Sequence, residues 1–173
     1  MKKIFLNLKA FLQSLNSKTP EKLSKILLRE AFQISSAESC TGGLVSSRLT
    51  DISGSSAYIK ANFVTYSNEA KHRILNVSES TLEKYGAVSE ECAKEMAQGL
   101  LQLTQSDIVI CTTGVAGPTG SERKPVGLMY AACGFNNKIS VKKFELNPNY
   151  SRKNMKFMFS EKALEFVLET IQQ

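Results

Sequence analysis

Residues 33–50 read QISSAESCTGGLVSSRLT, and this stretch contains the pattern that decides the fold. Residues 33–37 predict a short strand, residues 38–43 a tight turn, and Leu44–Thr50 the start of a helix. The paired glycines that end the turn let the backbone come close to a ligand. A strand that leads through such a turn into a helix is typical of an α/β protein.

The rest of the chain continues this alternation and then departs from it. Residues 58–66 are rich in β-formers and predict a second strand. Asp107–Thr112 (DIVICT) is the nearly continuous apolar run expected of a buried central strand, and Ser89 caps a helix that reaches about Leu103. Val126–Phe135 and Ile139–Leu146 then predict a hairpin, and a closing amphipathic helix follows. The order predicts a single α/β domain, a three-layer α/β/α fold with a mixed β-sheet.

The first 19 residues have a different character from the rest. Large apolar residues recur there at helical spacing: Phe5, Leu8, Phe11, Leu12 and Leu15. We expect residues 1–19 to form a helical extension that packs on the domain or on another subunit, and residues 20–173 to form the enzyme domain. Pro20 opens the next helix, with Thr19 as its expected cap. No stretch is long and apolar enough to cross a membrane, so no membrane partner is expected.

Composition narrows the functional classes. Hydrophobic residues at 42% and charged residues at 22% are the balance of an ordinary globular protein. The net charge of +6 favours anionic partners, but no stripe of interleaved aromatic and basic residues supports nucleic acid. The four cysteines lack C-x-x-C spacing and the chain has one histidine, so we expect no metal. Unpaired cysteines are typical of a reducing compartment, which predicts a cytoplasmic location.

Three segments with reactive residues follow three predicted strands. The first is the turn that carries Ser39, where N–H groups at the helix start favour an anion or an oxyanion. The second places Lys71 about one helical turn beyond Tyr66. The third is the Gly/Pro-rich loop at residues 113–124. Because ligands of open α/β sheets bind beyond the carboxyl ends of strands, we expect the three segments to share one cleft.

The chemistry of this cleft depends on which residue is the nucleophile and which is the base. A serine hydroxyl needs a base, and lysine can serve if burial lowers its pKa. Taken alone, Ser39 is equally a helix cap and Lys71 a surface lysine. Cys40 is a rival nucleophile, but successive turn residues point in different directions, so only one faces the substrate. His72 is a rival base, but it does not share a helix face with Lys71 and we expect it to be exposed.

Four segments in order resemble the CinA C-terminal domain family, the nicotinamide mononucleotide deamidases. The segments are Ala37–Gly43, Val64–Lys71, Tyr85–Glu90, and Thr113–Pro118 with Lys124–Gly127. The resemblance covers most of the chain and implies a three-layer α/β/α fold. It implies hydrolysis of nicotinamide mononucleotide to nicotinic acid mononucleotide and ammonia, without metal or cofactor. It also implies a small nucleotide as the partner and assembly into a homo-oligomer.

The resemblance assigns roles to particular residues. By the family's pattern Ser39 is the nucleophile, Lys71 the general base, and Tyr66 an assisting group. Residues expected to bind the substrate are Glu38, Cys40, Thr41, Gly42, Gly43, Asn68, Thr113, Gly114, Ala116, Gly117 and Arg152. Tyr66 or Glu38 would face the cationic pyridinium ring, and Arg152 the phosphate. Lys156 aligns with a second basic residue of the family.

Two departures from the family's pattern leave an alternative open. The loop between Pro118 and Lys124 is about one residue shorter than usual, and residues 145–151 intervene before Arg152. A catalytically silent nucleotide-binding or regulatory protein of the same fold would tolerate such changes. Ammonia release distinguishes that alternative from the deamidase.

Overall fold

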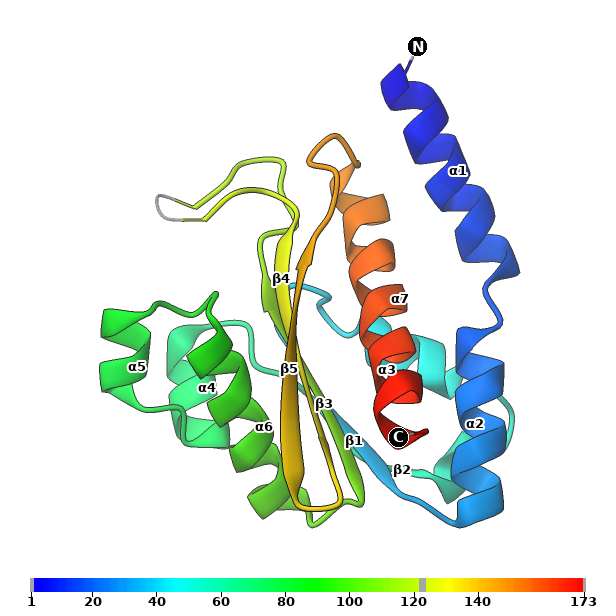
Figure 1. Ribbon diagram of the computed structural model, residues 1–173, viewed down its shortest axis with the longest axis vertical. Coiled ribbons are helices and arrows are strands. Elements are labelled where there is room, and N and C mark those ends of the chain that lie inside the picture. Colours follow the sequence, from blue (N-terminus) through cyan, green and yellow to red (C-terminus); the bar gives the residue numbers. More distant parts are fainter. Residues whose placement is uncertain (1, 122–123, 173) are drawn as a thin grey trace.

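The computed structural model describes residues 2–121 and 124–172, and its centre is one five-stranded sheet (Figure 1). The strand order is β2-β1-β3-β4-β5. β1 pairs in parallel with β2 and β3, whereas β4 and β5 extend the sheet antiparallel. The strands are β1 (Ile34–Glu38), β2 (Ile59–Val64), β3 (Ile108–Gly114), β4 (Leu128–Phe135) and β5 (Lys138–Glu145). The predicted mixed sheet is confirmed.

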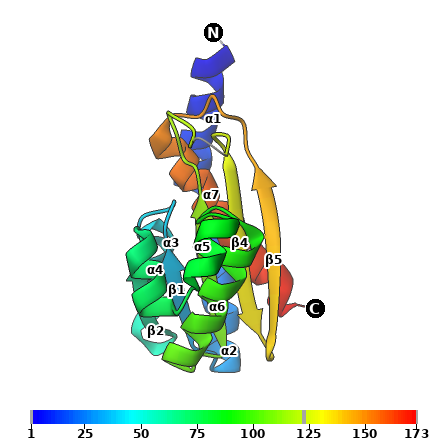
Figure 2. The same ribbon diagram turned by 90° about the vertical axis from the view of Figure 1, so that its left-hand side faces the viewer.

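Helices cover both faces of the sheet, as Figure 2 shows from the side. One face carries α4 (Asn68–Leu75), α5 (Glu79–Lys84) and α6 (Glu90–Thr104). The other carries α2 (Thr19–Glu30), α3 (Leu44–Thr50) and α7 (Arg152–Ile171), and α1 (Lys2–Asn16) packs on the outer side of α7. A short 3-10 helix at Ser55–Ala57 precedes β2. The three-layer α/β/α prediction is therefore confirmed.

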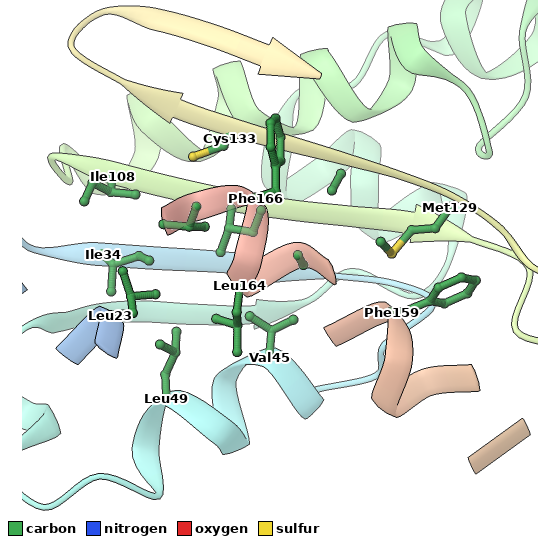
Figure 3. Close-up of a cluster of buried hydrophobic side chains, with 14 of the residues drawn as sticks. Leu23, Ile34, Val45, Leu49, Ile108, Met129, Cys133, Phe159, Leu164 and Phe166 are labelled. Carbon is green, nitrogen blue, oxygen red and sulfur yellow. The ribbon is translucent and has the colours of Figure 1, made fainter. Parts of the chain in front are cut away.

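The sheet separates two hydrophobic cores, because neighbouring strand residues point to opposite faces. Ile108 and Ile110 of β3 join the core under α2, α3 and α7, which Figure 3 shows. Val109 and Cys111 of the same strand join the core under α6. All five residues of β1 are buried, as expected of a strand that is covered on both faces. The central strands thus fix the position of everything attached to their ends.

A close contact between α6 and α4 sets the position of α4. At Gly99 of α6, an added Cβ would lie 1.8 Å from the carbonyl oxygen of Leu75, the last residue of α4. Only a residue without a side chain permits this approach. The small residue therefore fixes how α4 lies against the sheet.

The sequence prediction of a Thr19 cap is wrong. Thr19 is the first residue of α2, its N-cap position is Lys18, and no side chain caps this helix. The Thr19 hydroxyl instead donates to the carboxylate of Glu161, which also pairs with Arg48. Burial opposes ionisation of Glu161, but the hydroxyls and Arg48 prevail and lower the pKa of its carboxyl group. The Thr19 hydroxyl binds Glu161 on α7 and is therefore not available to cap α2. Local sequence does not reveal this distant partner.

β3 extends two residues further toward the site than the sequence predicted. Thr113 and Gly114 were expected in the loop, but they pair with Tyr130 and Met129 of β4. The strand continues past its apolar run because pairing with β4 satisfies the backbone N–H and C=O groups of these two residues. The two residues are held in the sheet and not in a free loop.

α1 packs on the body through the face opposite to the one that the sequence favours. Ala10 is buried, and Asn7 exchanges hydrogen bonds with Asn149, Ser151 and Asn154 at the start of α7. The large apolar residues remain exposed: Ile4, Phe5, Leu8, Phe11 and Leu12. The hydrogen bonds of Asn7 therefore determine which face of α1 packs on the body.

Gly99→Ala tests the contact between α6 and α4. We expect this change to lower the free energy of unfolding by about 3 kcal/mol, because the added methyl overlaps a backbone carbonyl that cannot move without displacing α4. Urea unfolding followed by circular dichroism measures the loss. Gln98→Ala, at the exposed neighbouring position, is the control and should change stability by less than about 0.5 kcal/mol. Equal stability of both variants would show that α4 is not held by this contact.

Candidate active site

A cavity of about 310 Å³ opens where β1 and β3 end. Its lining comes from the three segments that the sequence singled out, from the loop before α6 and from the start of α7. The lining residues are Ser39, Cys40, Tyr66, Asn68, Lys71, Ala87, Val88, Thr113, Gly114, Val115, Ala116, Gly117, Thr119, Gly120, Ser121 and Arg152. Strand ends therefore gather the predicted residues at one place, as the topology requires.

Ser39 is held by the turn that follows β1. Its N–H donates to the carbonyl of Thr112 on the neighbouring strand at 3.0 Å, and its carbonyl accepts from the N–H of Gly42 at 3.1 Å. Glu38 fixes the next element, because its two carboxylate oxygens accept from the N–H groups of Val45 (3.0 Å) and Ser46 (2.8 Å). This carboxylate caps the first turn of α3. Hydrogen bonds thus hold the backbone both before and after Ser39.

Lys71 reaches Ser39 from α4. Its Nζ lies 3.2 Å from the Ser39 Oγ, 2.9 Å from the Thr65 carbonyl oxygen and 3.4 Å from that of Tyr66. Ser67 caps α4 by accepting from the N–H of Ala70, which fixes the helix start three residues before the lysine. The predicted convergence of an alcohol and an amine is present in the structure.

The surroundings of Lys71 favour the uncharged amine. The residue is 1% exposed, and burial lowers the pKa of its amine. No carboxylate in the described part of the chain forms an ion pair with it. A neutral amine has two N–H donors and one lone pair. Two carbonyls and one hydroxyl match that set, with the lone pair left for the Ser39 proton.

Cys40 and His72 do not have the geometry of rivals to this pair. The Cys40 side chain belongs to the hydrophobic core, and burial raises the pKa of its thiol to about 12. Cys40 therefore lines the cavity through its backbone, and its N–H is unpaired within residues 2–121 and 124–172. His72 is exposed and its Nδ1 contacts the Val77 carbonyl. The prediction of an exposed His72 is confirmed.

Arg152 joins two walls of the cavity. Its Nη1 donates to the carbonyl of Gly117, and its Nη2 donates to the hydroxyl of Tyr66 at 2.9 Å. Although residues 146–151 separate it from β5, the start of α7 brings this arginine to the site. The insertion in the sequence has therefore not removed a cation from the cavity.

Four residues expected to bind the substrate do not line the cavity: Glu38, Thr41, Gly42 and Gly43. Glu38 is fully buried with both oxygens committed to α3, so it cannot face a pyridinium ring. The hydroxyl of Thr41 pairs with that of Thr112 at 2.8 Å. Gly42 and Gly43 adopt left-handed φ angles of 60° and 89°, which glycine tolerates best. All four shape the turn that presents Ser39.

The cavity also contains residues that were not singled out: Ala87, Val88, Val115, Thr119, Gly120 and Ser121. Ala87 and Val88 belong to the loop before α6, and the Thr113 hydroxyl donates to the Ala87 carbonyl at 2.6 Å. The Tyr85–Glu90 motif was the only sequence signal for this wall. In the described residues no cluster of three or more His, Cys, Asp or Glu side chains could hold a metal.

The fold and the site together define a three-layer α/β/α protein with a buried serine–lysine pair. The model of the CinA C-terminal domain matches residues 16–171. The chain therefore belongs to the CinA C-terminal domain family.

Individual relatives agree with this assignment. A CinA-like protein of Chloroherpeton thalassium is 48% identical over 154 residues, which are 87% of this chain and 37% of that protein. The chain spans under two fifths of the length of the first curated relatives that it matches. The competence damage-inducible protein A of Klebsiella pneumoniae has a TM-score of 0.86 at 29% identity, with 90% of this chain and 96% of that chain covered.

A further solved structure is similar to the same degree. The competence/damage inducible protein of Agrobacterium tumefaciens has a TM-score of 0.85 at 35% identity, with 90% of this chain and 94% of that chain covered. Both structural matches leave about a tenth of this chain uncovered. α1 lies outside residues 16–171 except for its last residue.

The thiols provide a test of the site's geometry. All four cysteines are buried, and burial raises the pKa of each thiol. We expect the native protein at pH 8 to react with an aromatic disulfide reagent only on unfolding, when all four thiols become reactive. A single thiol that reacts rapidly in the native state, and that Cys40→Ala removes, would place Cys40 in the cavity as a nucleophile.

Proposed function

We propose that this protein hydrolyses the carboxamide of nicotinamide mononucleotide to give nicotinic acid mononucleotide and ammonia. The contact of 3.2 Å between the Ser39 Oγ and the Lys71 Nζ, in a buried setting that favours the neutral amine, carries this proposal. Membership of the CinA C-terminal domain family supports the substrate class. The cavity volume of about 310 Å³ is at the lower end of the range for small-molecule sites.

In the first half of the reaction Lys71 takes the proton of the Ser39 hydroxyl while Oγ attacks the carboxamide carbon. The C–O bond to the serine forms and the carbonyl oxygen takes a negative charge. The protonated Lys71 then donates its proton to the amide nitrogen as the C–N bond breaks. Ammonia leaves and an acyl-enzyme remains.

In the second half water replaces ammonia. Lys71, neutral again, takes a proton from the water as the oxygen attacks the acyl carbon. The proton then returns to the Ser39 Oγ when the ester bond breaks. The carboxylic acid product carries the water oxygen, and the free serine is restored.

The backbone around Ser39 supplies the oxyanion contact. The N–H of Cys40 follows the nucleophile, lines the cavity and has no partner among the described residues. In α/β-hydrolases, where the nucleophile also lies on a strand-to-helix turn, the N–H of the residue after the nucleophile contributes to the oxyanion hole. Ala116 lines the same cavity, and its N–H group likewise has no partner in the part of the chain that the structure describes. Preorganised donors of this kind stabilise charge that develops in the transition state.

The two ends of the substrate have opposite charges, and the cavity has a group for each. The Tyr66 side chain is 60% exposed at the cavity and offers a ring face to the cationic pyridinium. Arg152 offers a guanidinium to the phosphate and needs only to exchange its present contacts with Tyr66 and Gly117. Asn68 supplies an amide at the same wall. Of the two groups expected at the pyridinium, Tyr66 remains and Glu38 does not, while Arg152 keeps its expected role at the phosphate.

Ammonia release from nicotinamide mononucleotide tests the proposal. We expect Ser39→Ala and Lys71→Ala each to lower kcat by roughly 10³-fold or more, because each removes a member of a nucleophile–base pair. A coupled assay for ammonia measures the rate. Ser140→Ala and Lys138→Ala, exposed positions on β5, are matched controls and should keep the wild-type rate.

The other outcomes have definite meanings. Nucleotide binding with no ammonia release from the wild-type protein would favour the catalytically silent alternative. Activity that survives Ser39→Ala and disappears in Cys40→Ala would give the nucleophile role to the cysteine. Full activity in Lys71→Ala would remove the lysine from the mechanism.

A further inference from the structure

The exposed face of α1 is the largest feature of the molecule that the site does not use. Five apolar side chains with spacings of one, three and four residues lie on this face: Ile4, Phe5, Leu8, Phe11 and Leu12. Their exposed fractions run from 48% to 72%. A contiguous apolar surface on a helix marks a site of contact with another body.

The way α1 docks makes this exposure a property of the fold. The body-facing side of the helix holds Ala10 and the hydrogen-bonded Asn7, so the apolar stripe stays exposed, and Phe11 also lines a groove beside α7. Turning the stripe inward would break the bonds from Asn7 to Ser151 and Asn154. Figure 1 shows α1 beside α7 at the outer side of the molecule, and its apolar side chains are exposed among the described residues.

The N-terminal region that contains α1 is positively charged. Residues 1–30 contain seven basic and two acidic residues, a net charge of +5 out of +6 for the whole chain. All seven described cations of this stretch are exposed: Lys2, Lys3, Lys9, Lys18, Lys22, Lys25 and Arg29. α1 itself has three lysines and no acidic residue. The remaining chain has a net charge of +1, so most of the net positive charge lies in α1 and α2.

A groove beside the stripe combines the same two properties. It has a volume of about 540 Å³ and lies between α1 and α7, with Phe11 at its edge. Leu44 and Phe157 contribute apolar surface to its lining, and Arg152, Lys153 and Lys156 contribute cations. An apolar surface edged by cations matches a molecule with an acyl chain and an anionic headgroup.

We propose that α1 and the basic face of α2 attach the protein to the surface of an anionic lipid bilayer. α1 would lie in the plane of the interface with its apolar stripe among the acyl chains and its lysines at the headgroups. No helix in the described ranges has the length and apolar character to span a membrane, so the contact is peripheral. The sequence expectation of no membrane partner considered spanning segments and not a helix on the surface.

Charge favours lipid over a second copy of this chain. Pairing two α1 stripes would bring together two helices that each have three lysines and no acidic residue, and these repel each other. An anionic bilayer satisfies the apolar stripe and the cations together. The proposal is independent of the deamidase activity.

Vesicle sedimentation with the full chain tests the proposal. We expect the protein to pellet with phosphatidylcholine vesicles that contain phosphatidylglycerol, and to stay in solution with pure phosphatidylcholine or at high salt. Phe5→Ser/Leu8→Ser/Leu12→Ser should weaken the partition at least about tenfold through lost apolar burial. Leu103→Ser on α6, which removes a leucine that is 51% exposed elsewhere, is the matched control and should bind normally.

A second variant separates charge from the apolar stripe. Lys2→Gln/Lys9→Gln should weaken binding to the anionic vesicles by roughly tenfold, whereas Lys60→Gln/Lys138→Gln, exposed on the sheet, should not. Circular dichroism melting confirms that each variant is folded. No pelleting with anionic vesicles, or equal pelleting of all variants, would overturn the proposal. A dimer in equilibrium sedimentation that the α1 triple variant dissociates would assign the stripe to a second copy instead.

Discussion

Everything that the candidate site can do depends on a lysine amine buried against a serine hydroxyl. A buried ammonium without a carboxylate is costly, and the protein relieves this cost by favouring the neutral amine. In its neutral form Lys71 has a lone pair for the Ser39 proton, while the carbonyls of Thr65 and Tyr66 accept its N–H groups. In the proposed mechanism, the same burial that would destabilise a charged side chain makes the amine available as a base.

The fold serves this contact through rigid elements and not through flexible loops. β1 carries Ser39 at its end, and α4 carries Lys71, so two secondary structure elements set their separation. Glu38 clamps α3 beneath the serine, and Gly99 lets α6 hold α4 closely. These residues touch no reacting atom, yet each fixes an element that does. A site whose supports lie on strands and helices is held more precisely than one on loops.

Much of this arrangement was accessible from the sequence, and the failures share one cause. Strand ends followed by glycine turns predicted the α/β/α sheet and the meeting of Ser39 with Lys71. The roles of Glu38 and Thr19 were missed because each depends on a tertiary partner: the N–H groups of α3 for one, and Glu161 for the other. Periodicity likewise identified α1 as amphipathic but could not say which face docks, since the hydrogen bonds of Asn7 decide that. Sequence pattern fixes which residues share a face, whereas partners distant in the chain decide what that face meets.

The pKa of the Lys71 amine is the quantity on which the account rests most directly. It can be measured in the resting protein by NMR of ¹⁵N-labelled lysine, with Lys71→Arg to assign the signal. We predict a pKa below the ordinary lysine value of about 10.4, so that the free base accumulates as pH rises through this lowered pKa. The rate of ammonia release should rise over the same pH interval. A Lys71 pKa at or above the ordinary value would mean that the amine stays charged beside Ser39, and would contradict the mechanism.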